Sequence, residues 1–258
     1  MRARARLESF LLPLAAAALL VAAWDAAVRA THTNVFPSPG AVARGLLELG
    51  RKGLLLPYVR DSLVRVAAGY GAALLVGVPL GVFLGWHASA ARAANPLIQF
   101  LRPISPLAWI PVAIVLFGVN DLAAVFLIFL ASVFPVLVST MDGVRGVPTM
   151  YRQAGLNFGL SPPALLARVV FPAALPEILT GVRIALGVAW IVVVAAEMIA
   201  VNSGLGYLVI DSRNAGKRYD LVVAAMLLIG LIGLALNLGV QRLSRLRAVR
   251  WASRVEAP

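Results

Sequence analysis

The chain has 258 residues, of which 61% are hydrophobic and only 13% are charged, and its mean hydropathy is +0.90. This composition excludes an ordinary soluble domain, whose apolar fraction is nearer about one half. The formal net charge of +12 does not indicate a nucleic-acid-binding protein, because the basic residues gather at the ends of apolar runs. Without cysteine the chain has no disulfide, thiol nucleophile or thiolate metal ligand.

Apolar runs of about 20 residues recur along the chain, long enough to cross the roughly 30 Å hydrocarbon layer of a bilayer as helices. The short alternating segments that a membrane β-barrel requires are absent from the sequence. We therefore expect an all-α integral membrane protein with about six transmembrane helices. The two histidines, His32 and His87, are far apart and lack a nearby carboxylate cluster, so no metal site is expected.

The first apolar run covers about residues 10–28 and follows three arginines within the first six residues. A secretory signal peptide has the same layout, with a basic head before an apolar run. This run exceeds the roughly 7–15 apolar residues of a signal peptide, and Trp24 and Asp25 stand where small cleavage-site residues belong. We expect a retained first helix, with cleavage as the alternative.

Residues 29–60 form a polar loop in which a turn-rich segment, 36–40, precedes a short amphipathic helix. Val42, Leu46 and Leu49 recur at nearly helical spacing, with charged residues between them. Such a helix is expected to lie in the plane of the membrane interface. Residues 1–60 are thus predicted to form a transmembrane helix followed by an extracytoplasmic amphipathic loop.

The second predicted span covers residues 62–86. Gly77, Gly81 and Gly85 follow one another at intervals of four, which gives one face of the helix a small-residue stripe that another helix can approach closely. Residues 87–106 are predicted to be a short connection. The third span then opens within the proline-rich segment 103–111, where a straight helix is not expected.

Three further spans are predicted at residues 122–140, 178–201 and 221–240. The predicted core therefore covers residues 61–241 and contains one long loop, 142–176. A basic tail, 242–258, follows it. Most of the 23 lysines and arginines lie on the side of the two chain ends, so both termini are predicted to be cytoplasmic, as six spans require.

The loop at 142–176 has the pattern of two short helices about a bend. Residues 149–156 favour a helix, and Gly159 breaks it because glycine accepts backbone angles that other residues avoid. Ser161 can cap a second helix, 162–170, which is expected to end before Pro172. From these residues alone, the loop is either a hairpin on the membrane surface or a docking element for a partner.

This segment resembles the cytoplasmic coupling loop of bacterial ABC-importer permeases, in which Glu-Ala-Ala is followed four residues later by Gly and then by an Ile-x-Leu-Pro ending. The matching positions are Gln153, Ala154, Gly155, Gly159, Val169, Phe171 and Pro172. The nitrate/sulfonate/taurine-type permeases are similar over further segments: 62–66, 106–111, 168–187, 195–199 and 204–207. The resemblance covers nearly the whole chain and is weakest before Asn34.

The resemblance implies a type I ABC importer permease fold in a bacterial inner membrane, and a loop that docks into a separate ATPase subunit. The coupling residues it implies are Gln153, Ala154, Gly155, Leu156, Gly159, Leu160 and Ser161. Gln153 replaces the family's Glu, and Gly155 replaces its second Ala, which loosens a helix by roughly 1 kcal/mol. Docking is expected to persist despite both changes.

The family's organisation further implies partners and cargo. The chain has no Gly-x4-Gly-Lys-Ser/Thr loop for phosphate, so it should hold no cofactor and have no catalytic residues, with ATP and Mg²⁺ bound by the partner ATPase. One coupling loop per chain implies a homodimer with two ATPase subunits and an extracytoplasmic substrate-binding protein. The cargo implied is a small anion of the sulfonate, taurine or nitrate type.

Glu197 is the leading functional candidate within the bilayer, because ionisable groups there are costly and face an interior or an aqueous path. It could instead be a carboxyl group hydrogen-bonded between helices. Since an ionised Glu repels an anion, gating or helix locking is favoured over cargo recognition. Trp190, Trp109 and Asn237 are further candidates for the translocation path. The alternative function is an ion-coupled secondary transporter or channel that uses Glu197.

Overall fold

The computed structural model describes residues 2–31, 36–214 and 216–244. Within these residues the chain is helical and contains no strand. The helices are α1 (Arg2–Thr31), α2 (Pro39–Arg51), α3 (Leu55–Trp86), α4 (Ala88–Leu101), the 3-10 turn η1 (Pro106–Trp109), α5 (Ile110–Phe117), α6 (Asp121–Arg145), α7 (Thr149–Asn157), α8 (Pro162–Leu165), the π-helical turn η2 (Leu166–Val170), α9 (Phe171–Ala200), α10 (Leu205–Asn214) and α11 (Tyr219–Ser244).

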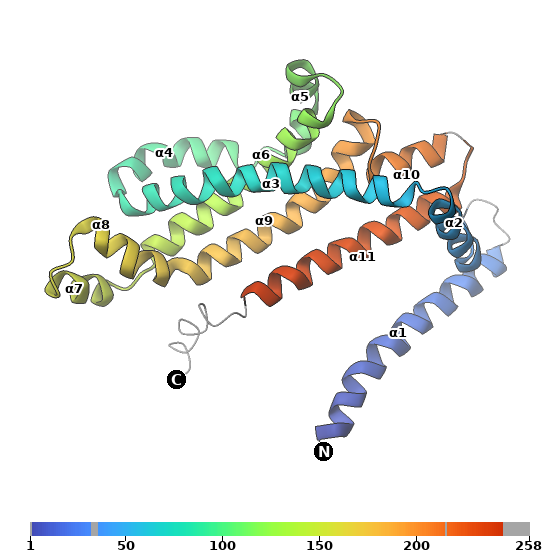
Figure 1. Cartoon of the computed structure of the whole chain (residues 1–258), viewed down its shortest axis with the longest axis horizontal. Coiled ribbons are helices and arrows are strands. Elements are labelled where there is room, and N and C mark those ends of the chain that lie inside the picture. The colour runs from blue at the N-terminus through green and yellow to red at the C-terminus, as the bar shows by residue number, and fades with distance from the viewer. Residues whose placement is uncertain (1, 32–35, 215, 245–258) are drawn as a thin grey trace.

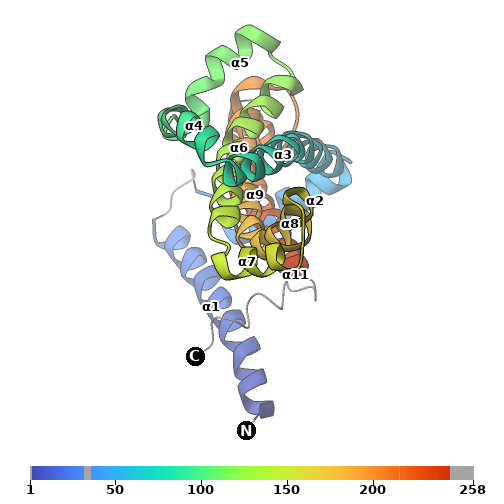
Figure 2. The same cartoon turned by 90° about the vertical axis from the view of Figure 1, so that its left-hand side faces the viewer.

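An elongated core is formed by α3, α6 and α9, and α11 runs alongside it (Figure 1). Helices α7 and α8 lie at one end of this bundle, and α2 and α10 lie at the other (Figure 1). In both views α1 extends away from the core (Figures 1 and 2). The two ends of the bundle are therefore built from different parts of the chain, joined by long helices.

Five described helices are long and apolar enough to cross a membrane: Leu11–Thr31, Leu55–Trp86, Asp121–Arg145, Pro162–Ala200 and Tyr219–Arg242. A sixth span results if Ala88–Leu101 and Pro106–Phe117 are counted together, although they are bent by 82° at their junction. This confirms the prediction of an all-α membrane protein with about six spans.

The prediction for the third span needs correction. Residues 87–106 are not a short connection, because α4 occupies most of them. The apolar helix that follows the proline-rich segment, α5, has only 8 residues, so it is about 12 Å long and cannot cross a bilayer by itself. Prolines at 103, 106 and 111 remove backbone donors where one straight helix would need them, so the chain turns here.

The glycine stripe of α3 packs against α6, as the spacing predicts. A Cβ atom on Gly77 would lie 2.9 Å from Val136, one on Gly81 2.6 Å from Thr140, and one on Gly85 2.6 Å from Val144. The two residue numbers differ by the same amount in all three pairs. The two helices therefore run parallel and keep one register along the contact. Only glycine allows backbones to approach this closely.

Helix α2 confirms the predicted amphipathic helix, and Ser38 caps it by accepting a hydrogen bond from the N–H of Ala41 at 3.3 Å. Val42 and Leu49 of its apolar face are buried, and Leu49 packs against Leu208 of α10 and Ala225 of α11, so this face packs on protein. On its outer side Glu48 accepts from Arg218 at 2.6 Å. Hydrogen bonds from Arg218 and then Lys52 hold the pKa of Glu48 at about 2, so the carboxylate is ionised at neutral pH.

We predict that Gly81→Ala lowers the melting temperature of the protein, because the added methyl group must push α6 away from α3. Overpacking of this kind costs typically about 1–3 kcal/mol. The matched control is Gly71→Ala on the same helix, where no atom lies within 4 Å of a Cβ position. Thermal unfolding in detergent compares the two variants. A Gly81→Ala protein as stable as the control would contradict the close contact between α3 and α6.

Candidate functional site

One candidate site is a hairpin, residues 149–165, at the end of the bundle (Figures 1 and 2). Gly159 forms its bend with a φ of +77°, a left-handed conformation that favours glycine. The N–H groups of Gly159 and Leu160 donate back to Leu156 and Gly155 at 2.9 and 3.1 Å. The sequence pattern of helix, glycine bend and second helix is therefore present as predicted.

The residues predicted to couple to an ATPase are distributed unevenly on this hairpin. Five of them are exposed: Gln153, Ala154, Leu156, Gly159 and Ser161. Leu160 is half-buried and packs on the apolar cluster that the hairpin shares with α6 and α9. Gly155 is buried, and a Cβ there would come within 2.5 Å of Leu165, so the small residue lets α7 and α8 lie close together.

The hairpin presents large apolar side chains on its surface. Phe158 is 88% exposed, and Met150 and Leu156 are also exposed. Phe158 was missed as a candidate, although an aromatic residue beside the turn glycine was a signal that could have identified it. Large apolar side chains exposed on a hairpin outside the core are typical of a surface that binds another protein.

The second short helix does not end before Pro172, so that prediction is wrong. α8 continues through the π-helical turn η2 into α9, which makes one apolar helix of 39 residues, Pro162–Ala200. In η2 the N–H of Phe171 donates to Leu166, five residues back. This wider turn spares the helix the clash that Pro172 would make with a carbonyl four residues earlier. The hairpin is thus directly continuous with α9.

A second candidate site is a buried ion-pair cluster at the opposite end of α9, formed by Ser62, Arg65, Asp121, Glu197 and Ser203. Glu197 is fully buried. It accepts hydrogen bonds from Nη1 of Arg65 at 2.7 Å, from Oγ of Ser62 at 2.9 Å and from the N–H of Gly206 at 2.9 Å. These donors come from two neighbouring helices, α3 and α10.

Arg65 is the centre of the cluster. Besides Glu197, it contacts Asp121 at 2.7 Å and donates to the carbonyl oxygen of Ser203 at 2.9 Å. It also donates to the hydroxyl of Ser203. Asp121 is the first residue of α6, and its side chain is 72% exposed. One guanidinium group therefore joins α3 to the start of α6, the end of α9 and the turn before α10.

Two glycines shape the turn that closes over Glu197. Gly204 has a φ of +102°, and a Cβ there would lie 2.3 Å from Oε1 of Glu197. A Cβ on Gly206 would lie 2.2 Å from the carbonyl oxygen of Val194. Side chains at these positions would displace the carboxylate or separate the helices, so the spacing Gly-x-Gly is a packing requirement of the cluster.

Sequence reasoning found Glu197 but missed its partners. Of the two alternatives for Glu197, the structure has the carboxyl group hydrogen-bonded between helices. The missed signal was Arg65, a charged residue within an apolar span, which requires a buried partner. Arg183 does not pair with Glu197, in agreement with the roughly 21 Å expected between them along the helix.

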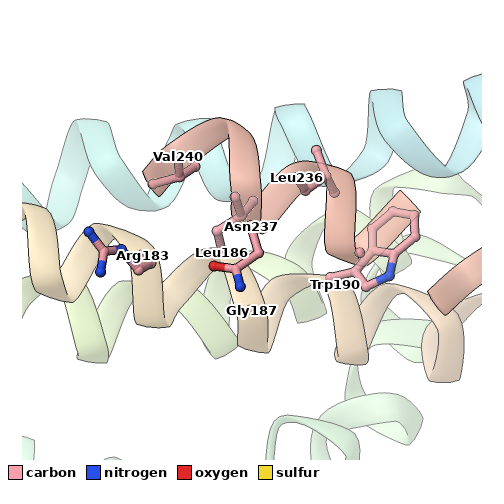
Figure 3. A pocket seen from close by; sticks show the side chains of 8 residues that line it. Arg183, Leu186, Gly187, Trp190, Leu236, Asn237 and Val240 are labelled. Carbon is pink, nitrogen blue, oxygen red and sulfur yellow. The ribbon is translucent and has the colours of Figure 1, made fainter. Parts of the chain in front are cut away.

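The remaining candidates do not share a site with Glu197. Trp190 and Asn237 line a cavity of about 290 Å³ between α9 and α11, together with Arg183 (Figure 3). Trp109 lies in η1 and packs against a different apolar cluster, formed with α5, α6 and α9. The four residues predicted for a path therefore belong to three separate places.

Comparisons with known proteins agree with this architecture. The family model described as binding-protein-dependent transport system inner membrane component matches residues 77–251. A bicarbonate transport system permease of Synechococcus elongatus is 35% identical, covering 94% of this chain and 91% of its own length. The taurine transport system permease of Escherichia coli is 36% identical, covering 93% and 89%.

The fold is similar to that of a solved transporter. An inward-facing conformation of the MetNI methionine ABC transporter matches with a TM-score of 0.66, covering 74% of this chain and 95% of that chain. The sequence identity is 18%, so this match concerns the fold. It agrees with the prediction of a type I importer permease fold.

We predict that Arg65→Ala destabilises the protein by about 3–5 kcal/mol, because it leaves the Glu197 carboxylate buried without a compensating charge. The double variant Arg65→Met/Glu197→Leu removes both charges and should recover a large part of this loss. Unfolding in detergent measures both. A single variant that is no less stable than the double variant would contradict the role of the ion pair.

Proposed function

We propose that two copies of this chain form the translocation path of an ABC importer, because the chain belongs to the family of binding-protein-dependent transport system inner membrane components. As a member, it is a non-catalytic permease subunit and a multi-pass membrane protein, and its ATPase and substrate-binding protein are separate partners. The proposed assembly has two ATPase subunits, which bind ATP and Mg²⁺, and it lies in a bacterial inner membrane.

The homodimer is supported by α1. Its apolar segment Leu11–Thr31 has a mean hydropathy of 2.0, yet none of it is buried within the chain. In the bundle it stands apart from α3, α6 and α9 (Figures 1 and 2). A second copy offers such a helix a protein partner, and two copies supply two hairpins for two ATPases.

The hairpin carries the proposal, because it combines an exposed apolar tip with a rigid connection to the core. Phe158 is the most exposed large apolar residue of the hairpin, and Arg152 ties α7 to the end of α6 through a hydrogen bond to Val144 at 2.6 Å. We propose that this tip docks into the ATPase in the cytoplasm, with both chain ends on the same side of the membrane. The coupling residues would then include Gln153 and Ala154.

The proposed cargo is a small anion, such as bicarbonate, a sulfonate, taurine or nitrate. Two relatives that match almost the whole chain are named for bicarbonate and taurine transport. The separate binding protein would select among such anions. The permease would provide a path that does not repel a negative charge.

We propose that Glu197 and Arg65 act as a helix lock in this cycle. The continuous helix that begins at Pro162 leads from the hairpin to Glu197 over about 50 Å, so a displacement of the hairpin can reach the ion-pair cluster through one helix. The exposed carboxylate of Asp121 can give up its contact with Arg65 and be hydrated instead. The free-energy cost is lower than it would be for the buried carboxylate of Glu197. The alternative, an ion-coupled transporter, is disfavoured because Glu197 is enclosed on all sides by its donors.

The docking role is tested by Phe158→Asp. The charge should reduce co-purification of the ATPase by at least about tenfold, because a carboxylate cannot be buried unpaired in an apolar groove. Leu47→Asp, an exposed apolar residue of α2 at the other end of the bundle, is the matched control. Gly159→Glu should act like Phe158→Asp. Full retention of the ATPase by both hairpin variants, with normal membrane insertion, would refute the docking role.

The helix lock is tested by Glu197→Gln, which keeps the shape but removes the charge. Assembly with the ATPase should be retained, whereas ATP turnover should no longer depend fully on the loaded binding protein. The measurement is ATP hydrolysis and uptake in proteoliposomes. Wild-type turnover and uptake would leave Glu197 with a packing role only, and uptake driven by an ion gradient without ATPase would support the alternative function.

A further inference from the structure

The third apolar segment is interrupted near the middle of the bundle. Residues 102–105, called the break below, separate α4 from the turn η1 and α5, and the two parts are bent by 82°. α4 shares an apolar cluster with Leu137 and Met141 of α6, whereas η1 and α5 share another with Ala123 and Leu127. The break therefore lies beside the middle of α6, about 18 Å from each end of that 25-residue helix.

The backbone of the break is open to its surroundings. Arg102, Pro103 and Ser105 are exposed, and neither Pro103 nor Pro106 has an N–H group. Among the residues that the structure describes, no donor reaches the carbonyl oxygens of Arg102, Pro103 or Ile104. Irregular backbone at membrane depth is tolerated only where it is buried in protein or lines a water-filled cavity. The break is therefore not expected to face lipid tails.

Arg102 adds a charge to the break. Its guanidinium group forms no hydrogen bond or ion pair with any residue that the structure describes, and an arginine at membrane depth faces the interior of a bundle or water. Residues 88–120 contain Arg92 and Arg102 but no carboxylate, and the facing part of α6, residues 122–141, contains no charged residue. The charge beside the break is therefore positive.

The described part of the chain leaves this side of the bundle uncovered. α4 and α5 lie on one side of the α3–α6–α9 core, and α1 and α11 lie on the opposite side (Figures 1 and 2). Large apolar residues on both flanks of the break are also exposed: Leu97, Phe100, Leu107 and Val112. A second copy can therefore approach this side and enclose an aqueous space next to the break.

We propose that the break lines the aqueous path between two copies and that Arg102 binds the transported anion there. A guanidinium group donates two parallel hydrogen bonds to a small oxyanion, such as a carboxylate or a sulfonate. The phosphate of a lipid is too far away, because the break lies about 18 Å from both ends of α6. The path rests on the proposed function, whereas the positive charge at the break does not.

The lack of cysteine in the chain allows a direct test with single thiols. Ser105→Cys places a thiol in the break, and Leu75→Cys is the matched control. Leu75 is 79% exposed on α3, and it lies at the same depth as the break because Gly77 meets Val136 of α6.

The full-length permease with its ATPase is placed in nanodiscs, without nucleotide and with a non-hydrolysable ATP analogue. The measurement is the rate at which each thiol reacts with two water-soluble methanethiosulfonates. One of these reagents carries a sulfonate group, and the other carries a trimethylammonium group.

Ser105→Cys should react at least about tenfold faster than Leu75→Cys in one nucleotide state, because a charged reagent does not enter hydrocarbon. The sulfonate reagent should react faster than the cationic reagent. Adding Arg102→Gln should lower the ratio of these two rates at least about fivefold, because the attraction of one charge is lost. Arg102→Lys should keep most of the ratio. Arg92→Gln removes an exposed charge about 15 Å away along α4 and should leave the ratio unchanged.

Three results would overturn the proposal. Equal rates for Ser105→Cys and Leu75→Cys in both nucleotide states would remove the break from the path. A disulfide between two copies of Ser105→Cys, without reaction with either reagent, would make the break a dry contact between copies. A ratio that Arg102→Gln leaves unchanged would show a hydrated break that does not attract anions through this side chain. The proposed function is judged separately, by whether the ATPase is retained in the same preparations.

Discussion

The buried pair of Arg65 and Glu197 is the constraint on which the end of the bundle opposite the hairpin depends. Removing a carboxylate and a guanidinium group from water is costly, and only close contact with satisfied hydrogen bonds compensates for it. Here every contact crosses between elements: Ser62 and Arg65 from α3, Gly206 from α10 and Asp121 from α6. The helices cannot shift independently without exposing a buried charge or leaving it without its partner, so this cluster holds α3, α6, α9 and α10 together.

α9 connects this cluster to the opposite end of the protein. Since α8, η2 and α9 form one helix, the second arm of the hairpin, from Pro162, and Glu197 belong to the same helix. The close glycine contact between α3 and α6 holds these two helices together, and both pack alongside α9. A force applied at Phe158 can therefore reach the ion-pair cluster through the hydrogen-bonded bend at Gly159 and then along one helix.

Charge is distributed in a way that suits an anion path. Glu197 would repel an anion if it were exposed, but Arg65 neutralises it, and the surrounding glycines leave no space beside it. Arg183 lies near the middle of the long helix Pro162–Ala200, in the wall of a cavity between α9 and α11. The buried carboxylate of this end of the bundle is thus neutralised by a paired cation.

Apolar run lengths, the glycine interval of four and the bend at Gly159 were sufficient to predict the fold class, the close helix seam and the hairpin, because these patterns act within one helix or one turn. Tertiary structure alone decided which partners Glu197 has, since Arg65 lies 132 residues away in sequence and any of several charges could have met it. It also decided that Pro172 sits inside a continuous helix, because a π-helical turn removes the clash that a local rule predicts. Short-range geometry is encoded in neighbouring residues, whereas the pairing of buried charges depends on which helices the whole bundle brings together.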